Sequence, residues 1–387
     1  MTRSSFSLGG LLLFISTCLW AAPSIDPAED HLHFGLPENN LFWTPEEQVA
    51  GYRNSARIFP TRQIEAGTNP LPLPEGEPLP ESIVEALETY VAERDVAGLL
   101  VLHRGRLRYE RYALGNTEHT LWVSFSVAKS ITSLLVGAAL QDGSLASLED
   151  KVSDYLPALA DSAYAEVNIR QLLQMRSGVA WNEDYSDPGA DINQIPWPTQ
   201  AAQAYLADRP RVADPGMSFN YNTAETNLVG DIVRAATGES LAGYLSRKIW
   251  RPFGMQAAGN WELVEPGGAE YGGSSINATL RDYGRLGLFV LQRGRLPNGT
   301  ATLAPDWIQQ STTAAGTHPA YGYQWWLGSD GSFQAQGIFG QAIYIDPGSE
   351  LVIALNSAWP VAADADYFAA RDKLFARIRE ELMLRDE

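Results

Sequence analysis

Two hydrophobic patterns alternate along the chain, and the changes between them divide it into parts. Positions 98–102 form a continuous apolar run, and positions 107–112 alternate between apolar and polar residues with period two, after a turn at 104–106. Together these segments predict a β-hairpin over 96–113. The last third returns to the strand pattern, with Gly, Pro and Asp turns between the segments. Further strands are expected at 321–328, 333–337, 341–346 and 351–357.

Helical periodicity occupies the middle of the chain and both flanks of the strand segments. Helices are expected at 80–92, 126–140, 167–176, 223–237, 241–250, 280–292 and 364–384. Strands at both ends with helices between them predict an α+β fold. In the simplest arrangement, the early hairpin and the late strands form one antiparallel sheet flanked by N- and C-terminal helices. A mainly helical lobe, about 140–280, is then inserted in a domain covering 81–387, with a site in the cleft between them.

The N-terminal residues differ in composition from this domain. Residues 23–80 are rich in Pro, Glu and Asn and predict an irregular arm around the main body. Residues 1–22 predict a signal peptide, with Arg3, an apolar run from Leu8 to Trp20, and small residues at Ala21 and Ala22. Export to the periplasm or medium is therefore expected. A lipoprotein anchored through Cys18 is disfavoured, because Ser16 and Thr17 fit that motif poorly.

Composition narrows the classes of partner. The chain has 387 residues, 45% of them hydrophobic, and a net charge of −18. An acidic surface repels phosphate backbones, so we expect no nucleic-acid partner. No segment after the N-terminus is long and apolar enough to predict stable membrane insertion. Cys18 is the only cysteine and lies in the expected signal peptide, so disulfides and thiol catalysis are not expected in the mature protein.

The most informative short motif is Ser126-Val127-Ala128-Lys129, at the start of an apolar helical segment. Residues three apart share a helix face, and burial lowers a lysine pKa enough for it to act as a base. Ser126 could simply cap the helix, but a lysine among so many apolar residues is costly unless it is paired or functional. The helix N-terminus also favours negative charge, and the Ser126 N–H could form half of an oxyanion hole.

Two later segments could complete such a site. Tyr221 opens the predicted helix at 223–237, and its phenol could be held near ionisation by Lys129 and pass on a proton. Gly337 and Ile338 lie where a strand ends, and their backbone could approach a substrate closely. Core packing for the tyrosine and turn geometry for the glycine are the alternatives.

These three motifs, in this order, resemble the serine β-lactamase and penicillin-binding superfamily, in particular its class C-like branch. Four stretches resemble the 6-aminohexanoate-dimer hydrolase and carboxylesterase-like group: 126–130, 175–183, 221–226 and 337–341. The resemblance covers roughly 80–385. It implies Ser126 as nucleophile, Lys129 and Tyr221 as proton carriers, and the Ile338 N–H as the second oxyanion donor.

The chain also departs from the pattern of that branch. Class C β-lactamases have Tyr-x-Asn, whereas the third position here is Thr223. Their Lys-Thr-Gly corresponds to Ala335-Gln336-Gly337, and no Lys, Arg or His lies between Pro319 and Asp364. The cation that would hold a β-lactam carboxylate is missing, so efficient β-lactamase activity is not expected.

Several residues are candidates for substrate binding. The acidic loop after Trp181 could bind an amine through Asp184 or Asp187, and aromatic residues could form a wall beside the substrate. One of Trp325 and Trp326 should be core, since successive strand residues face opposite ways. The candidates are Trp181, Asp184, Tyr185, Asp187, Asn277, Trp325 and Gly337.

The sequence therefore predicts an exported serine hydrolase that cleaves a small amide or ester through an acyl-enzyme, without metal or cofactor. D-amino-acid peptidase or weak β-lactamase activity is the alternative within the same chemistry. A non-catalytic ligand-binding or sensor protein on the same fold is the alternative from another class.

Overall fold

The computed structural model describes residues 22–316 and 318–386. The expected signal peptide therefore lies outside the described residues, apart from Ala22. Within the described part, no helix has the length and apolar character needed to cross a membrane.

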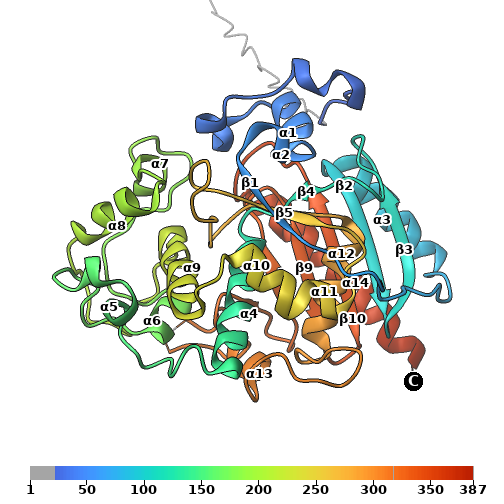
Figure 1. The fold of residues 1–387 in the computed structure, drawn as a ribbon. Coiled ribbons are helices and arrows are strands. Elements are labelled where there is room, and N and C mark those ends of the chain that lie inside the picture. The colour runs from blue at the N-terminus through green and yellow to red at the C-terminus, as the bar shows by residue number, and fades with distance from the viewer. Residues whose placement is uncertain (1–21, 317, 387) are drawn as a thin grey trace, which may run out of the picture.

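A six-stranded antiparallel sheet forms the centre of the molecule (Figure 1). Its strand order is β3-β2-β10-β9-β8-β7, so the early hairpin and the late strands share one sheet, as expected. β7 is much shorter than the segment 321–328 that the sequence indicated. The strands are β2 (Val96–His103), β3 (Arg106–Tyr112), β7 (Trp326–Leu327), β8 (Phe333–Gln336), β9 (Ala342–Asp346) and β10 (Leu351–Ser357).

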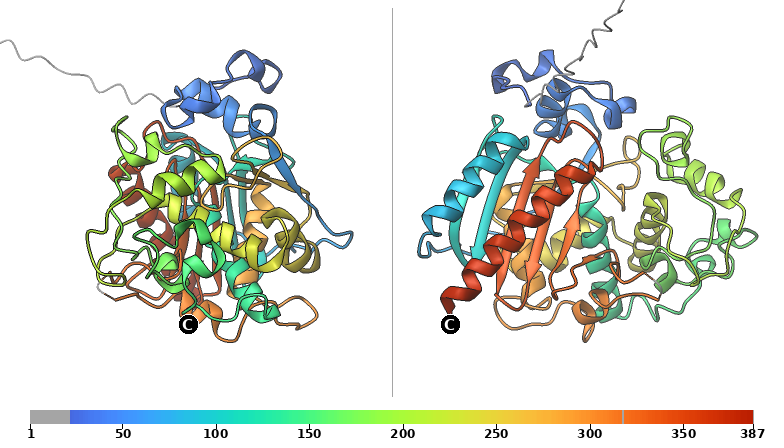
Figure 2. Two further views of the ribbon diagram at one scale, coloured as in Figure 1. Left: turned by 60° about the vertical axis from the view of Figure 1, so that its left-hand side comes forward. Right: turned by 180° about the vertical axis from the view of Figure 1, so that it is seen from behind.

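Helices cover both faces of this sheet. α3 (Glu81–Glu93) and α14 (Ala365–Asp386) pack on one face, and α12 (Leu280–Leu291) packs on the other, as the two views in Figure 2 show. β2 is buried on both faces because its side chains alternate between these two layers. Leu99 packs with α3 and α14, whereas Leu100 packs in the core that contains α12.

The helical lobe lies beside the sheet, and α4 (Val127–Asp142) runs between the two (Figure 1). α4 packs against both α9 and β8, so its first turn is at the boundary between lobe and sheet. Apart from α12 and α14, the helices that follow α4 in the sequence are α5 (Val152–Tyr155), η3 (Pro157–Leu159), α6 (Ile169–Leu173), α7 (Asp191–Gln194), α8 (Thr199–Ala207), α9 (Thr223–Thr237), α10 (Leu241–Leu245), η4 (Ser246–Trp250), α11 (Arg251–Phe253) and α13 (Trp307–Ser311).

A second, four-stranded sheet was not predicted. Its order is β1-β5-β6-β4, and its strands are β1 (Thr61–Ile64), β5 (Gly259–Glu262), β6 (Ile276–Ala278) and β4 (Trp122–Val123). Each strand has two to four residues, too few to show a periodic pattern. The sheet matters for function because β4 leads directly into the turn that carries Ser126.

The N-terminal arm is more regular than its composition suggested. It contains η1 (Pro27–Leu32), η2 (Pro37–Phe42), α1 (Pro45–Tyr52) and α2 (Ser55–Ile58). α1 forms because Thr44 and Glu47 make a reciprocal capping box ahead of Pro45, with Thr44 N donating to Glu47 Oε2 at 2.8 Å. A buried ion pair between Arg53 and Asp30 then ties the arm together.

Candidate active site

Ser126 lies in a tight turn between β4 and α4. Phe125, just before it, has a φ of 44°, a left-handed conformation that is unusual for an aromatic residue. Ser126 occupies the N-cap position of α4, but its side chain makes no capping hydrogen bond. The hydroxyl is therefore available for another role, and the capping interpretation of this serine is excluded.

Lys129 lies one turn along α4 and points back at that hydroxyl. Its Nζ donates to Ser126 Oγ, Thr223 Oγ1 and the Gly273 carbonyl oxygen, each at 2.9 Å. All three ammonium donors are thus used. The side chain is buried, which lowers the Lys129 pKa to about 8, and the charge of Glu183 opposes part of this shift. Near neutral pH, a usable fraction of this lysine is the free amine.

Tyr221 covers the other side of Lys129. Lys129 Nζ lies 5.1 Å from the centre of the Tyr221 ring, and the ring stacks on Trp326 at 5.6 Å. Burial, and then the charge of Glu183, raise the Tyr221 pKa well above its usual value, although a hydrogen bond with Ser126 lowers it. This corrects the expectation that the phenol is held near ionisation. The tyrosine is suited to passing on a proton, and the lysine to accepting one.

Gly337 and Ile338 follow β8 and approach the Ser126 turn. A Cβ atom built on Gly337 would lie 2.7 Å from the Ser124 carbonyl oxygen, so only glycine permits this approach. The backbone N–H groups of Ser126 and Ile338 have no acceptor within the described part of the chain. Two unoccupied donors beside a serine hydroxyl are what an oxyanion hole requires.

An aromatic cluster from the arm supports both of these turns. Tyr52, the last residue of α1, packs at 5.0 Å from Phe125 and 5.6 Å from Phe339, and these two rings lie 5.0 Å apart. Phe125 precedes Ser126 in the chain, and Phe339 follows Ile338. One ring of the arm thus contacts the neighbours of both potential oxyanion donors.

The Ser126 hydroxyl opens into a cavity of about 730 Å³. Its walls come from the arm, from the segment between Trp181 and α8, and from the loop around β5. Glu38, Glu262 and Glu265 are among the lining residues, and no Lys, Arg or His is. In the part of the cavity around Ser126 the lining residues are Phe125, Ser126, Tyr185, Thr223, Ser275 and Ile338.

The acidic loop borders this cavity, but its predicted amine-binding residues do not. Tyr185 lines the cavity. The carboxylates of Asp184 and Asp187 instead accept hydrogen bonds from their own loop, from Ser186 N at 2.9 Å and Gly189 N at 2.8 Å, respectively. Neither aspartate is among the lining residues, whereas Glu38, Glu262 and Glu265 are.

Three other expected substrate contacts are placed elsewhere. Trp325 is core, 2% exposed and packed on Phe333, so its assignment to the substrate wall was wrong; Trp326 is the partner that faces Tyr221. Asn277 is also wrong as a substrate residue, because it is 1% exposed in β6 and donates to Asn260 Oδ1 at 2.8 Å. The indole of Trp181 is buried and donates to Glu183 rather than lining the cavity.

Sequence reasoning missed two partners of the site. Gly273 supplies a carbonyl to Lys129, and its Cβ position would lie 2.8 Å from the Thr223 carbonyl oxygen. The Gly272-Gly273 pair was the available signal, since paired glycines mark close backbone approach. Glu183 belongs to the acidic loop after Trp181, and no local pattern separates it from the acids that follow it.

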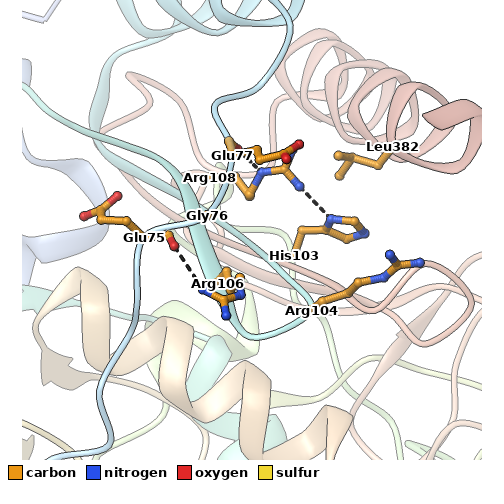
Figure 3. Close-up of a pocket in the computed structure, with 8 residues that line it drawn as sticks. All are labelled: Glu75, Gly76, Glu77, His103, Arg104, Arg106, Arg108 and Leu382. Atoms are coloured by element: carbon orange, nitrogen blue, oxygen red, sulfur yellow. Dashed lines mark hydrogen bonds between the residues drawn. The ribbon is translucent and has the colours of Figure 1, made fainter. Parts of the chain in front are cut away.

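A second hollow, of about 870 Å³, lies at the turn of the β2–β3 hairpin (Figure 3). Arg108 Nη1 and His103 Nδ1 are 2.8 Å apart there, and Arg106 donates to the Glu75 carbonyl at 3.2 Å. The Arg106 contact, with a hydrogen bond from Arg108 Nε to the Glu77 carbonyl, fastens residues 75–77 to the hairpin. None of the residues lining this hollow lines the Ser126 cavity.

Comparison with known proteins identifies the family of this chain. The family model described as Beta-lactamase matches residues 83–376. The chain belongs to the beta-lactamase family. It is a hydrolase of the serine β-lactamase and esterase type. A 6-aminohexanoate-dimer hydrolase of Paenarthrobacter ureafaciens is 27% identical over 298 residues, which cover 71% of this chain and 75% of that protein.

Solved structures of this family share the fold. A protein described as a 6-aminohexanoate-dimer hydrolase from Bacillus anthracis superposes with a TM-score of 0.79 at 22% identity, covering 90% of this chain and 97% of that one. A family VIII carboxylesterase superposes with a TM-score of 0.62 at 16% identity, covering 79% and 99%, respectively. The expected α+β fold, with a sheet and a helical lobe, is confirmed.

Proposed function

We propose that this beta-lactamase-family hydrolase cleaves a small amide or ester through an acyl-enzyme on Ser126. The observation that carries the proposal is the buried Lys129, whose Nζ lies 2.9 Å from Ser126 Oγ and whose pKa is lowered to about 8. A lysine amine at this distance accepts the serine proton as Oγ attacks the carbonyl carbon. The negative charge on the carbonyl oxygen is then stabilised by the Ser126 and Ile338 N–H groups.

The later steps use the same groups. The proton taken by Lys129 passes by way of the Tyr221 hydroxyl to the leaving amine or alcohol as the carbonyl–heteroatom bond breaks. Water then attacks the acyl-enzyme, gives a proton to Lys129, and the carboxylic acid leaves as Ser126 Oγ regains its proton. Each oxyanion donor contributes about 3 kcal/mol of transition-state stabilisation in comparable enzymes.

The cavity favours neutral or amine-bearing substrates over β-lactams. Its lining includes carboxylates and no cation, and the position of the β-lactamase Lys-Thr-Gly is Ala335-Gln336-Gly337. A β-lactam carboxylate would lie beside like charge here, without the lysine that normally receives it. The similarity to a 6-aminohexanoate-dimer hydrolase and to carboxylesterases agrees with small linear amides and short esters.

A fluorophosphonate probe tests the proposal directly. We expect stoichiometric labelling of the wild-type protein and none of Ser126→Ala, and absence of labelling above that variant would favour the non-catalytic binding protein. A hydrolysis panel of short p-nitrophenyl esters, 6-aminohexanoate dimer, D-aminoacyl amides and a chromogenic cephalosporin then identifies the substrate class. Fast turnover of the cephalosporin would contradict the argument from the missing cation.

Export is part of the same proposal. The charged start, apolar run and small residues of positions 1–22 are what support it. Expression of the full chain followed by fractionation should place the processed protein outside the cytoplasm. Retention of an unprocessed chain in the cytoplasm would contradict it.

A further inference from the structure

Glu183 is surrounded by hydrogen-bond donors. Its Oε1 accepts from the Thr223 hydroxyl and from Tyr185 OH at 2.7 Å. Its Oε2 accepts from Thr223 N at 3.0 Å and from Trp181 Nε1. Four donors satisfy both oxygens of an ionised carboxylate, which only accepts, whereas a protonated acid would direct its own O–H at one of them. The surroundings are therefore built for a negative charge.

Thr223 links this charge to Lys129. A threonine hydroxyl has one proton, and Thr223 donates it to Glu183 Oε1 while its oxygen accepts from Lys129 Nζ at 2.9 Å. The direction of these two hydrogen bonds is therefore fixed: Lys129 donates to Thr223, and Thr223 donates to Glu183. Thr223 is only 7% exposed, so these two hydrogen bonds are largely shielded from solvent.

We propose that Glu183 is a positioning residue that acts through Thr223 to aim the Lys129 amine at Ser126 and to stabilise the ammonium formed when Lys129 takes the serine proton. The inference rests on the proposed function. In the acylation step the proton moves from Ser126 Oγ to Lys129 Nζ, and the oxygen's electron pair forms the new bond to the carbonyl carbon. The positive charge that appears on Lys129 is then opposed by Glu183 across one hydroxyl.

The other titratable groups around Lys129 do not supply this charge. Glu225, two residues after Thr223 in α9, is 1% exposed and accepts from Tyr164 OH at 3.2 Å. Burial raises the Glu225 pKa to about 8, so it is mostly neutral at pH 7. Burial likewise raises the pKa values of Tyr185 and Tyr321. Within the described residues, Glu183 is the charge that acts on the pKa of Lys129.

This arrangement also accounts for the departure from Tyr-x-Asn. A threonine at position 223 has the single hydroxyl that can accept from Lys129 and donate to a carboxylate at once. In an asparagine amide the acceptor is the oxygen and the donors are on the nitrogen. The contacts with Lys129 and Glu183 would therefore have to be made by two different atoms. Thr223 and Glu183 therefore form a unit, and removing either should have the same effect.

The test is the pH dependence of fluorophosphonate labelling of Ser126, which needs no knowledge of the substrate. For the wild type, the rate should rise with pH as Lys129 loses its proton. In Glu183→Gln the midpoint should move to lower pH, because the ammonium has lost its counter-charge, and the high-pH rate should fall on the order of tenfold, because a weaker base remains. Thr223→Val should reproduce both changes, the double variant should add little, and Thr223→Ser should bring the midpoint back toward that of the wild type.

Asp208→Asn is the matched control, since it removes one exposed carboxylate from the same lobe. Its midpoint should stay at the wild-type value. If Glu183→Gln and Thr223→Val both keep the wild-type midpoint and rate, or shift no more than Asp208→Asn, the inference is overturned. Melting curves show whether each variant folds. If Glu183→Gln does not fold, the labelling profiles of Thr223→Val and Thr223→Ser decide whether the inference holds. Absence of wild-type labelling at every pH overturns the proposed function itself, which separates the two failures.

Discussion

The two ends of the Ser126 cavity are built differently. At the reaction end, Lys129 and Thr223 belong to two helices that pack on each other, and Ser126 is the N-cap of the first. Lys129 Nζ makes three buried hydrogen bonds there. At the outer wall, formed by residues 37–42, 188–198 and 262–266, the space is lined mainly by loops, together with a short 3-10 helix and the four-residue helix α7. Rigid elements hold reacting groups more accurately than loops do.

The family match covers the two ends to different extents. It begins at residue 83, so it contains the reaction end but not the part of the outer wall that comes from the arm. From this difference we expect the reaction end to determine the chemistry and the outer wall to determine which substrates enter. The predictions below test that division, beginning with the largest effect.

Loss of the base should be the most severe change. Lys129→Met keeps an unbranched apolar stem in the buried site but removes the amine that accepts the Ser126 proton. We expect a loss of about 10³- to 10⁴-fold in kcat/KM and in the rate of fluorophosphonate labelling. A variant that retains more than a tenth of the wild-type rate would assign the proton transfer to another group.

The pH profile should follow the same lysine. The Lys129 pKa is lowered to about 8, and the proposed mechanism requires the neutral amine. Activity should therefore reach its plateau above pH 8 and fall about tenfold per pH unit well below that value, so that pH 6 is roughly a hundredfold below the plateau. Steady-state kcat/KM between pH 5 and 10 measures this, and an acid limb near pH 5 would contradict it.

The arm should affect the reaction end through one contact. Tyr52→Leu removes the ring between Phe125 and Phe339, and aromatic pairs of this kind contribute about 0.5–1.5 kcal/mol each. We expect about a tenfold lower labelling rate with Ser126, Lys129 and Thr223 unchanged. Tyr52→Phe is the control, because the Tyr52 hydroxyl is buried without a partner among the described residues, and its rate should match the wild type. Equal labelling rates for the wild type, Tyr52→Leu and Tyr52→Phe would show that the arm lines the cavity without affecting the reaction end.

The smallest effect is expected at the outer wall itself. Glu38 and Glu265 are exposed lining residues, so Glu38→Gln with Glu265→Gln should raise KM a few-fold for an amine-bearing amide such as 6-aminohexanoate dimer. The same pair should leave a neutral p-nitrophenyl ester unaffected. The ratio of the two kcat/KM values is the measurement, and a parallel change in both would contradict a charge-specific role.

Much of the reaction end could be predicted from the sequence because it depends on local spacing. Ser126 and Lys129 are three residues apart in one helix, so their contact follows from helix geometry alone. The long helices and the main sheet were predictable for the same reason, since each has a sustained period. The two-residue strand β4 and the short helices of the arm have no such period.

The remaining partners depend on packing between distant segments. Glu183 meets Thr223 across 40 residues, and Gly273 meets Lys129 across 144. Neither pairing leaves a local sequence pattern that distinguishes Glu183 or Gly273 from its neighbours. Asp184, for example, is an acid of the same loop, and the sequence alone does not tell which of the two contacts Thr223. For Trp325 and Trp326 a local pattern exists but is incomplete. Alternation along a strand predicts that one of the two is core, and the structure shows that it is Trp325.

The contact of Tyr52 with Phe125 and Phe339 has a practical consequence. A gene trimmed to the matched boundaries, starting at residue 83, would encode Ser126, Lys129 and Ile338, yet lack the Tyr52 ring that lies against Phe125 and Phe339. Such a product could carry every catalytic motif and still react slowly. We therefore expect the smallest piece that contains the motifs to be shorter than the smallest piece that works as an efficient catalyst.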